Sequence, residues 1–229
     1  MNLGGDILKL YCREKLKANF YNFVLAKGGR LQTPMLQIKR NLQVKGLWKP
    51  DMTCLEMFGM FGLWNTVYYA GDVGHIDFFE IDEAVIKYAR KVLKGYEVEF
   101  YQADSIRYLT ETSKSYDLIY SDIPYGLTEY RGKYGIPNFL STALLHLRGG
   151  GIFITNMDSA EMSRFREIEE YVNHVSHDRV KDMFFVVPGG LIDMKITSTI
   201  LCGVLNQKKG IKDTENTAGD LRNLRRTGA

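Results

Sequence analysis

The sequence is poor in cysteine and proline and has no long hydrophobic run. Its three cysteines, Cys12, Cys54 and Cys202, are far apart and form no C-x-x-C pair, so they indicate neither a disulfide framework nor a zinc site. No uncharged apolar stretch reaches the roughly 18 residues of a membrane helix. The first residues also lack the apolar core of a secretion signal. We therefore expect a cytoplasmic protein that has no contact with a membrane.

A strong excess of one charge is also missing. The 229 residues carry a net charge of +3. This mild basicity is compatible with a nucleic-acid partner but does not require one, because nucleic-acid binders usually concentrate a larger basic excess on one face. With 45% hydrophobic and 25% charged residues, the composition is that of an ordinary soluble globular protein. The length suits one α/β domain.

The pattern of apolar residues changes at Pro50. Before it, two amphipathic helices are predicted, over residues 6–27 and 35–47. After it, short apolar runs predict strands at 53–57, 76–81, 98–102, 116–121, 151–156, 181–187 and 196–205. The stretches between them predict helices at 63–70, 83–94, 105–111, 136–147 and 160–175. Such alternation indicates right-handed βαβ units and a mostly parallel sheet.

The end of the chain departs from this alternation. The last two predicted strands are joined only by a short segment that contains Pro188-Gly189-Gly190. A connection this short forms a hairpin, so one of the two strands runs antiparallel. From Asn206 the chain is polar and has too few apolar residues to pack. We therefore expect a helical extension over 1–50 that is a candidate substrate lid, a sheet domain over 51–205, and a disordered tail over 206–229.

A glycine turn follows the first predicted strand in the sequence CLEMFGMFG, residues 54–62. Glu56 is followed by Phe58, Gly59 and Gly62, and glycines at such a turn let the backbone approach a ligand closely. The pattern is not the G-x-G-x-x-G of a dinucleotide site. A plain strand-to-helix turn without a ligand explains the same residues about equally well.

Two further acids end the second and third strands. Glu80, in FFEID, stands where a carboxylate can accept hydrogen bonds from both ribose hydroxyls of a nucleoside. Asp104, in QADS, stands where it can accept from an adenine amino group, although an N-cap of the next helix is the simpler interpretation of this residue alone. Asp82 and Glu83 are expected to cap the helix that follows them.

The fourth strand leads into a polar turn in YDLIYSDIPYG, residues 116–126. Ligands of open α/β sheets bind beyond the carboxyl ends of the strands. Here that edge carries Asp122, Pro124 and Tyr125 together, so a rigid turn holds an acceptor and an aromatic face at a fixed separation. An ordinary turn with an exposed Asp122 is the alternative.

The order and spacing of these segments, over residues 53–205, resemble those of class I S-adenosylmethionine-dependent methyltransferases. LEMFGMFG is similar to their first motif, FFEID to the ribose-binding acid, QADS to the adenine-contacting acid, and LRGGGIFITN to the turn before the fifth strand. YDLIYSDIPYG is similar to the D/N-P-P-Y motif of enzymes acting on exocyclic amino groups. The resemblance implies a Rossmann-like, doubly wound α/β sheet of seven strands, mostly parallel with an antiparallel final strand, behind a helical N-terminal lead.

The resemblance also implies which residues act. Asp122 and the carbonyl of Ile123 would orient an attacking amine, while Pro124 stiffens the turn and Tyr125 stacks on the substrate. The cofactor S-adenosylmethionine would lie against residues at the four strand ends. These are Glu56, Phe58, Gly59, Gly62, Glu80, Ile81, Asp104, Ser105 and Asp122. No metal ion is implied.

Two positions depart from the family pattern: Met60 stands where a glycine is usual, and Ile123 stands where amino-directed enzymes have a first proline. We expect N-methylation of an exocyclic amino group in a nucleic-acid base, with RNA favoured over DNA. The stretch from FFEIDEAVIKYARKVL to FLSTALLHLRGGGIFITN also resembles spermidine-synthase-type aminopropyltransferases, so a small amine or polyamine acceptor is the alternative. A non-catalytic binding module is a third interpretation, which Met60 favours.

Overall fold

The computed structural model describes most of the chain between residues 3 and 205. The described ranges are 3–26, 34–124, 127–158, 165–177, 179–186 and 198–205. The predictions for Tyr125, for the tail over 206–229 and for the first residues of the helix at 160–175 lie outside these ranges.

Five parallel strands form the part of the sheet that carries the predicted site. They are β1 (Thr53–Met57), β2 (His75–Glu80), β3 (Val98–Gln102), β4 (Tyr116–Ser121) and β5 (Leu147–Asp158). Their order is β3-β2-β1-β4-β5, and every neighbouring pair is parallel. The predicted Rossmann-like α/β fold with a helical N-terminus is thereby confirmed.

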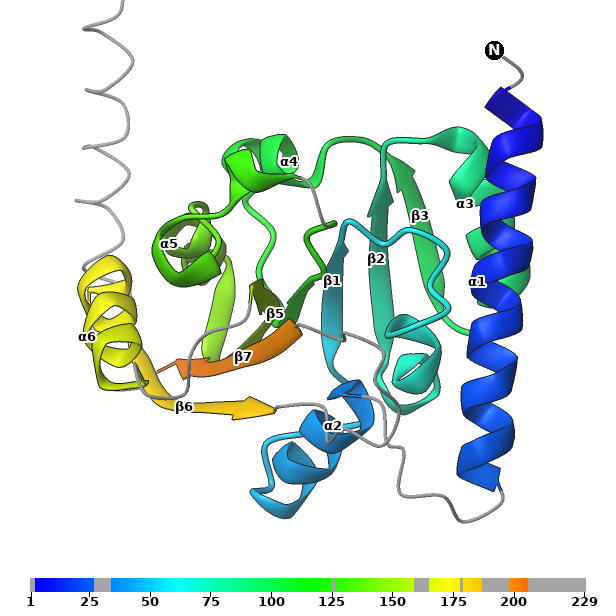
Figure 1. The fold of residues 1–229 in the computed structure, drawn as a ribbon. Coiled ribbons are helices and arrows are strands. Elements are labelled where there is room, and N and C mark those ends of the chain that lie inside the picture. Colours follow the sequence, from blue (N-terminus) through cyan, green and yellow to red (C-terminus); the bar gives the residue numbers. More distant parts are fainter. Residues whose placement is uncertain are drawn as a thin grey trace, which may run out of the picture.

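Two later strands continue the hydrogen bonding beyond β5. Strand β7 (Ser198–Leu205) lies between β5 and β6 (Val180–Val186) and pairs antiparallel with both. In Figure 1 these two strands extend the sheet on the side away from α1.

Helices cover both faces of the sheet, and chain turns lie at the ends of its strands (Figure 1). Their bounds are α1 (Leu3–Ala26), α2 (Pro34–Val44), α3 (Glu83–Val92), α4 (Ser105–Glu111), α5 (Leu140–Leu145) and α6 (Phe165–Ser176). Apolar residues of α2 and α3 bury one face of the strands, and those of α4, α5 and α6 bury the other. Helix α1 packs outside α3, where Tyr11 stacks on Tyr88 at 4.3 Å between ring centroids. None of the described helices is long and apolar enough to cross a membrane.

The prediction of a helix over residues 63–70 is wrong. The chain instead makes two short 3-10 turns, η1 (Thr66–Tyr68) and η2 (Ala70–Asp72). Aromatic and β-branched residues in this stretch have low helix propensity. The side chains of Thr66 and Tyr69 also bond to Glu56 inside the protein, which fixes the segment in its irregular path.

The helix predicted over 136–147 is shorter than expected, because α5 begins only at Leu140. Ile136 has an extended backbone, with φ −68° and ψ 136°. A residue before a proline is disfavoured in the helical region, and Pro137 follows it. At its end the prediction overlaps β5, which begins at Leu147.

Candidate functional site

The site lies at the edge where the parallel strands end. Because β1, β2, β3 and β4 run in the same direction, Glu56, Glu80 and Asp122 gather at one edge of the sheet. Backbone hydrogen bonds tie the turns together there. Gly59 N donates to Phe79 O over 3.0 Å, and Asp122 N donates to Met57 O over 3.4 Å. The topology therefore brings together three acids that are widely separated in the sequence.

The turn after β1 adopts a left-handed backbone at alternate residues. Phe58, Met60 and Gly62 have φ values of 56°, 49° and 68°. Only glycine takes this conformation without a steric penalty, so the turn keeps the glycine geometry even where Phe58 and Met60 supply side chains. At Gly59 a Cβ atom would lie 2.2 Å from Cζ of Phe78, so a larger residue does not fit there.

Glu56 is buried beneath this turn, with 1% of its surface exposed. Thr66 Oγ1 donates to one carboxylate oxygen over 3.0 Å, and the Tyr69 hydroxyl donates to the other. Burial raises the pKa of Glu56 from 4.5 to about 8, although both hydrogen bonds lower it. Glu56 therefore anchors the segment that follows the glycine turn, and its side chain does not reach the open edge.

Glu80 connects the end of β2 to the glycine turn. Its Oε1 accepts from the amides of Ile81 and Asp82 over 2.8 and 3.1 Å, and its Oε2 accepts from Met60 N over 3.0 Å. A carboxylate offers about four acceptor positions, so one position on Oε2 is left for a ligand hydroxyl. The Met60 amide, at the position that departs from the family pattern, thus orients the acid expected to bind ribose.

The residues next to Glu80 and after β3 present both apolar and polar groups. Ile81 is 71% exposed, which is unusual for an isoleucine and gives the edge an apolar face. Asp104 caps α4, since its Oδ1 accepts from Ile106 N and Arg107 N over 2.8 and 3.2 Å. No described residue bonds to Oδ2 of Asp104. Ser105, by contrast, is buried at 4% exposure.

Asp122 is held in place by a residue from the irregular segment. Asn65 Nδ2 donates to Oδ2 of Asp122 over 2.7 Å. No described residue bonds to Oδ1, so that oxygen is the acceptor that a substrate would meet. Burial raises the pKa of Asp122 to about 6, while the positive charge of Arg131 and the Asn65 bond act in the opposite direction.

The carbonyl oxygen of Ile123, which the sequence predicted as an acceptor for the substrate, is already occupied by protein donors. It accepts from Arg131 Nη2 over 2.8 Å and from Asn156 Nδ2 over 2.9 Å. Asn156 Oδ1 also accepts from Ile123 N over 3.0 Å. Because a carbonyl oxygen has two lone pairs, both are used within the protein. Ile123 and Asn156 therefore fix the start of the turn that Pro124 continues, and of the two predicted acceptors only Asp122 keeps an oxygen that no described residue occupies.

The described residues fit a sulfonium nucleoside at this edge. A carboxylate at Glu80, an apolar side chain at Ile81 and an unused oxygen on Asp104 lie at the ends of β2 and β3. Ser121, which is fully buried beside Asp122, has a hydroxyl with no hydrogen-bond partner among the described residues. A buried polar atom without a partner is costly, and this one belongs to the residue that precedes Asp122.

Several residues that build the site were missed by sequence reasoning. Asn65, Thr66 and Tyr69 lay inside a predicted helix, so their contacts with strand-end acids were not foreseen. For Asn156 the sequence did hold a signal, because a polar residue ends an apolar strand run there. In the structure this residue is 4% exposed. Arg131 lies in the loop after β4, and nothing in the sequence indicated a backbone carbonyl as its partner.

A second polar group lies where β2 and β3 begin, away from Asp122. His75, Asp77 and Glu99 could each offer one atom to a metal ion. Asp77 is already engaged, however, because it accepts from Lys114 Nζ over 2.5 Å and from the Tyr116 hydroxyl over 2.6 Å. The Lys114 ammonium balances the Asp77 charge, so this group is explained as a half-buried ion pair.

The solved structures that resemble this chain include several methyltransferases. An rRNA methylase from Streptococcus thermophilus aligns with a TM-score of 0.55 and 13% identity, over 78% of this chain and 100% of that chain. A methyltransferase from Pyrococcus furiosus aligns at 0.50 and 15%, over 74% and 82%. A tRNA methyltransferase from Aquifex aeolicus aligns at 0.50 and 14%, over 72% and 67%. At such identities the likeness establishes the fold alone. No curated protein sequence matches the chain.

A family model gives the more specific result. The spermine/spermidine synthase domain matches residues 63–202. The matched region begins directly after the glycine turn, includes Glu80, Asp104 and Asp122, and ends within β7. Because the match extends over more than half of the sequence, this chain belongs to the spermine/spermidine synthase domain family.

Proposed function

We propose that this protein is an S-adenosylmethionine-dependent transferase that methylates an amine nitrogen placed by Asp122. The observation that carries the proposal is the arrangement of Asp122. One of its oxygens is fixed by Asn65 at 2.7 Å, and the other is bonded to no described residue, at the carboxyl end of β4. A fixed acceptor at this edge can orient the lone pair of an incoming amine.

The donor would lie across the ends of β1, β2 and β3. Glu80 would accept from its ribose, Asp104 from its adenine amino group, and Ile81 would pack on the base. The turn containing Phe58, Gly59 and Gly62 would follow the methionine part, and Glu56 and Ser105 would support the adjoining turns from within. S-adenosylmethionine supplies a methyl group on a sulfonium, so the protein contributes mainly position and polarity.

Asp122 would act on the acceptor in two ways. Its carboxylate accepts a hydrogen bond from an N–H of the neutral amine, which aims the nitrogen lone pair at the donor methyl group. Its negative charge stabilises the positive charge that develops on nitrogen as the carbon–sulfur bond breaks, and the alkylated product then releases a proton to water. With a pKa of about 6 the group is mainly ionised at pH 7. Pro124 keeps the turn rigid. Tyr125, which lies outside the described residues, stays our candidate for a stacking platform.

The geometry at Ile123 bears on the class of acceptor. An exocyclic amino group of a base has two N–H bonds, and the D/N-P-P-Y arrangement meets them with a side chain and a carbonyl. Here that carbonyl is occupied by Arg131 and Asn156. A small aliphatic amine or polyamine needs only one anionic acceptor, so we favour this class. The family match points in the same direction. The RNA base expected from the sequence is the second candidate, supported by the amino-acid sequence of the segment at residues 116–126.

Label transfer tests both candidates. The protein is incubated with methyl-labelled S-adenosylmethionine, or with decarboxylated S-adenosylmethionine labelled in its aminopropyl chain, and with polyamines, total RNA or DNA as acceptors. We expect methyl label in an amine and loss of that label with Asp122→Asn. Label from the chain in a polyamine would instead show aminopropyl-type transfer. If Asp122→Asn transfers label as well as the native protein, the proposed role of Asp122 is wrong.

A further inference from the structure

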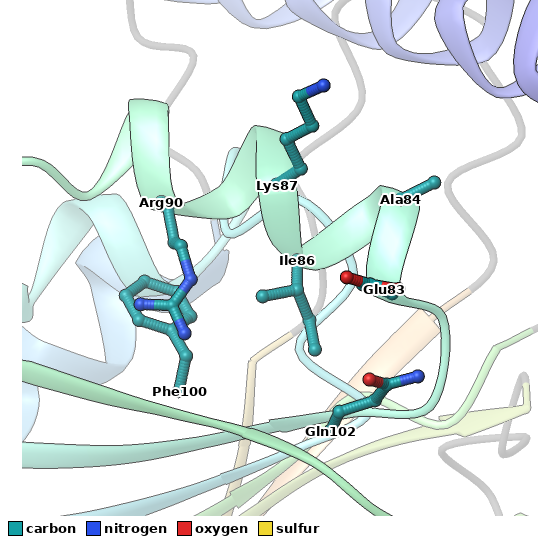
Figure 2. A pocket seen from close by; sticks show the side chains of 7 residues that line it. All are labelled: Glu83, Ala84, Ile86, Lys87, Arg90, Phe100 and Gln102. Carbon is teal, nitrogen blue, oxygen red and sulfur yellow. The ribbon is translucent and has the colours of Figure 1, made fainter.

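A hollow of about 580 Å³ lies between α3 and the edge strand β3, outside the strand-end site (Figure 2). Figure 2 shows Arg90 and Phe100 on one side and Glu83 and Gln102 on the other, with Ile86 between them. Ligand pockets in proteins typically enclose about 300–1,000 Å³, so the hollow has the size of a site for a small molecule.

Arg90 is an exposed cation that lies against an aromatic ring. Its guanidinium lies 4.6 Å from the centroid of the Phe100 ring. No carboxylate within the described part of the chain pairs with it, whereas Arg107 and Arg148 are paired with acids at 2.9 and 2.6 Å. A guanidinium held against an aromatic ring still has N–H donors available for a ligand, and such donors match phosphate and carboxylate oxygens. Lys87, one helical turn earlier, adds a second cation to the lining.

The opposite end of the hollow has different chemistry. Glu83, at the start of α3, and Gln102, at the end of β3, turn toward each other in Figure 2. Neither side chain has a hydrogen-bond partner among the residues that the structure describes. A carboxylate accepts from hydroxyl or amino groups, and an amide both donates and accepts. Ile86 provides an apolar surface between this end and Arg90.

We propose that this hollow binds a nucleotide, with its phosphate on Arg90 and Lys87 and its sugar or base on Glu83 and Gln102. The cations at one end suit the phosphate. The apolar surface of Ile86 and the acceptors and donors at the other end suit the sugar and the base. The hollow adjoins the proposed donor site, since Gln102 pairs with Glu80 in the sheet, but its lining contains none of Glu80, Ile81 and Asp104. The phosphate comes either from a free mononucleotide or from one unit of an RNA strand, and the two sources share this chemistry.

The test is calorimetric titration with the donor site first saturated by S-adenosylhomocysteine. The probes are adenosine monophosphate, inorganic phosphate and a short single-stranded oligoadenylate. Arg90→Gln removes the proposed phosphate fork, and Glu83→Gln removes the acceptor at the other end. Lys94→Gln makes the same charge change just beyond α3, outside the lining, and serves as the matched control. Thermal denaturation of each variant checks that it is folded.

We expect Arg90→Gln to weaken nucleotide binding about tenfold or more, because a charge-assisted hydrogen bond to the phosphate is lost, and Lys94→Gln to leave binding unchanged. Glu83→Gln should weaken the mononucleotide but not inorganic phosphate. Preference for oligoadenylate over the monophosphate would identify an RNA strand as the source. Equal losses with Arg90→Gln and Lys94→Gln, or no binding of any probe at millimolar concentration, would overturn the proposal. Failure of S-adenosylhomocysteine to bind in the first step would count against the proposed transferase function and not against this site.

Discussion

Asn65 holds Asp122 across the site: Nδ2 of Asn65 lies 2.7 Å from Oδ2 of Asp122. The two residues are 57 positions apart in the sequence. The same segment donates from Thr66 and Tyr69 to Glu56. One short irregular stretch after the glycine turn therefore fixes two strand-end carboxyls, which makes that stretch part of the site and not only a connection between β1 and β2.

Asn65→Ala should raise the pKa of Asp122 above its value of about 6. The Asn65 amide stabilises the ionised carboxylate, and its removal leaves burial as the dominant influence. Carbon-13 NMR titration of the Asp122 carboxyl measures this directly. Asn41→Ala, which alters an exposed asparagine on α2, is the control. An unchanged Asp122 midpoint in Asn65→Ala would show that the bond has no role in setting its charge.

Glu56 should make the folded protein less stable as the pH rises. Its pKa is raised from 4.5 to about 8, so the folded state binds the proton more tightly than the unfolded state does. The contribution of Glu56 to stability is therefore complete below pH 4.5 and is lost as the pH rises toward 8. The loss is on the order of 1 kcal/mol for each unit by which the pKa is raised.

Glu56→Gln keeps the shape and cannot ionise. Urea unfolding at pH 5 and pH 8.5 should show that this variant loses less stability between the two pH values than the native protein. The variant should be the more stable of the two proteins at pH 8.5. Parallel pH dependences in the two proteins would mean that Glu56 is ionised in the folded state throughout this range.

The two left-handed residues of the glycine turn should respond oppositely to glycine. Met60→Gly relieves a strained backbone at a residue that is 37% exposed, so we expect no loss and up to about 1 kcal/mol of gain in stability. Phe58→Gly relieves similar strain but removes ring contacts with Tyr130 and Phe139, at 5.7 and 6.2 Å between centroids. We expect it to destabilise by about 1–3 kcal/mol. Chemical denaturation of both variants measures these changes in stability. Destabilisation by Met60→Gly would argue against backbone strain at Met60.

Asn156→Ala should be destabilising by about 2 kcal/mol, because it leaves the buried N–H of Ile123 without a partner. Arg131→Lys should cost less, since Asn156 still bonds to the Ile123 carbonyl. Urea midpoints of the two variants give the comparison. A smaller loss with Asn156→Ala than with Arg131→Lys would contradict the view that Asn156 locks this turn.

The regular elements could be predicted from the sequence because their apolar patterns are local. The predicted strands at 53–57, 98–102 and 116–121 coincide with β1, β3 and β4. Since parallel strands end at one edge, the acids Glu56, Glu80 and Asp122 could also be assigned to that edge before their contacts were known.

The contacts within the site could not be predicted in the same way. Asn65, Thr66 and Tyr69 act through an irregular segment whose path is set by the acids Glu56 and Asp122. A helix was expected there only because the segment follows a glycine turn and lies between two strands. The occupied Ile123 carbonyl depends on Arg131 and on Asn156, which lies 33 residues further on. Pairings over such distances follow from the closed fold and have no local pattern.

The central claim is that the strand-end edge binds a sulfonium nucleoside with Glu80 as its ribose acceptor, beside an acceptor site at Asp122. Isothermal titration with S-adenosylmethionine and S-adenosylhomocysteine tests it most directly, in the native protein and in the Glu80→Gln and Asp122→Asn variants. We predict saturable binding of both nucleosides, weakened about tenfold in Glu80→Gln through loss of a charged acceptor and nearly unchanged in Asp122→Asn. No binding to the native protein at millimolar concentration, or equal binding in native and Glu80→Gln proteins, would contradict the account.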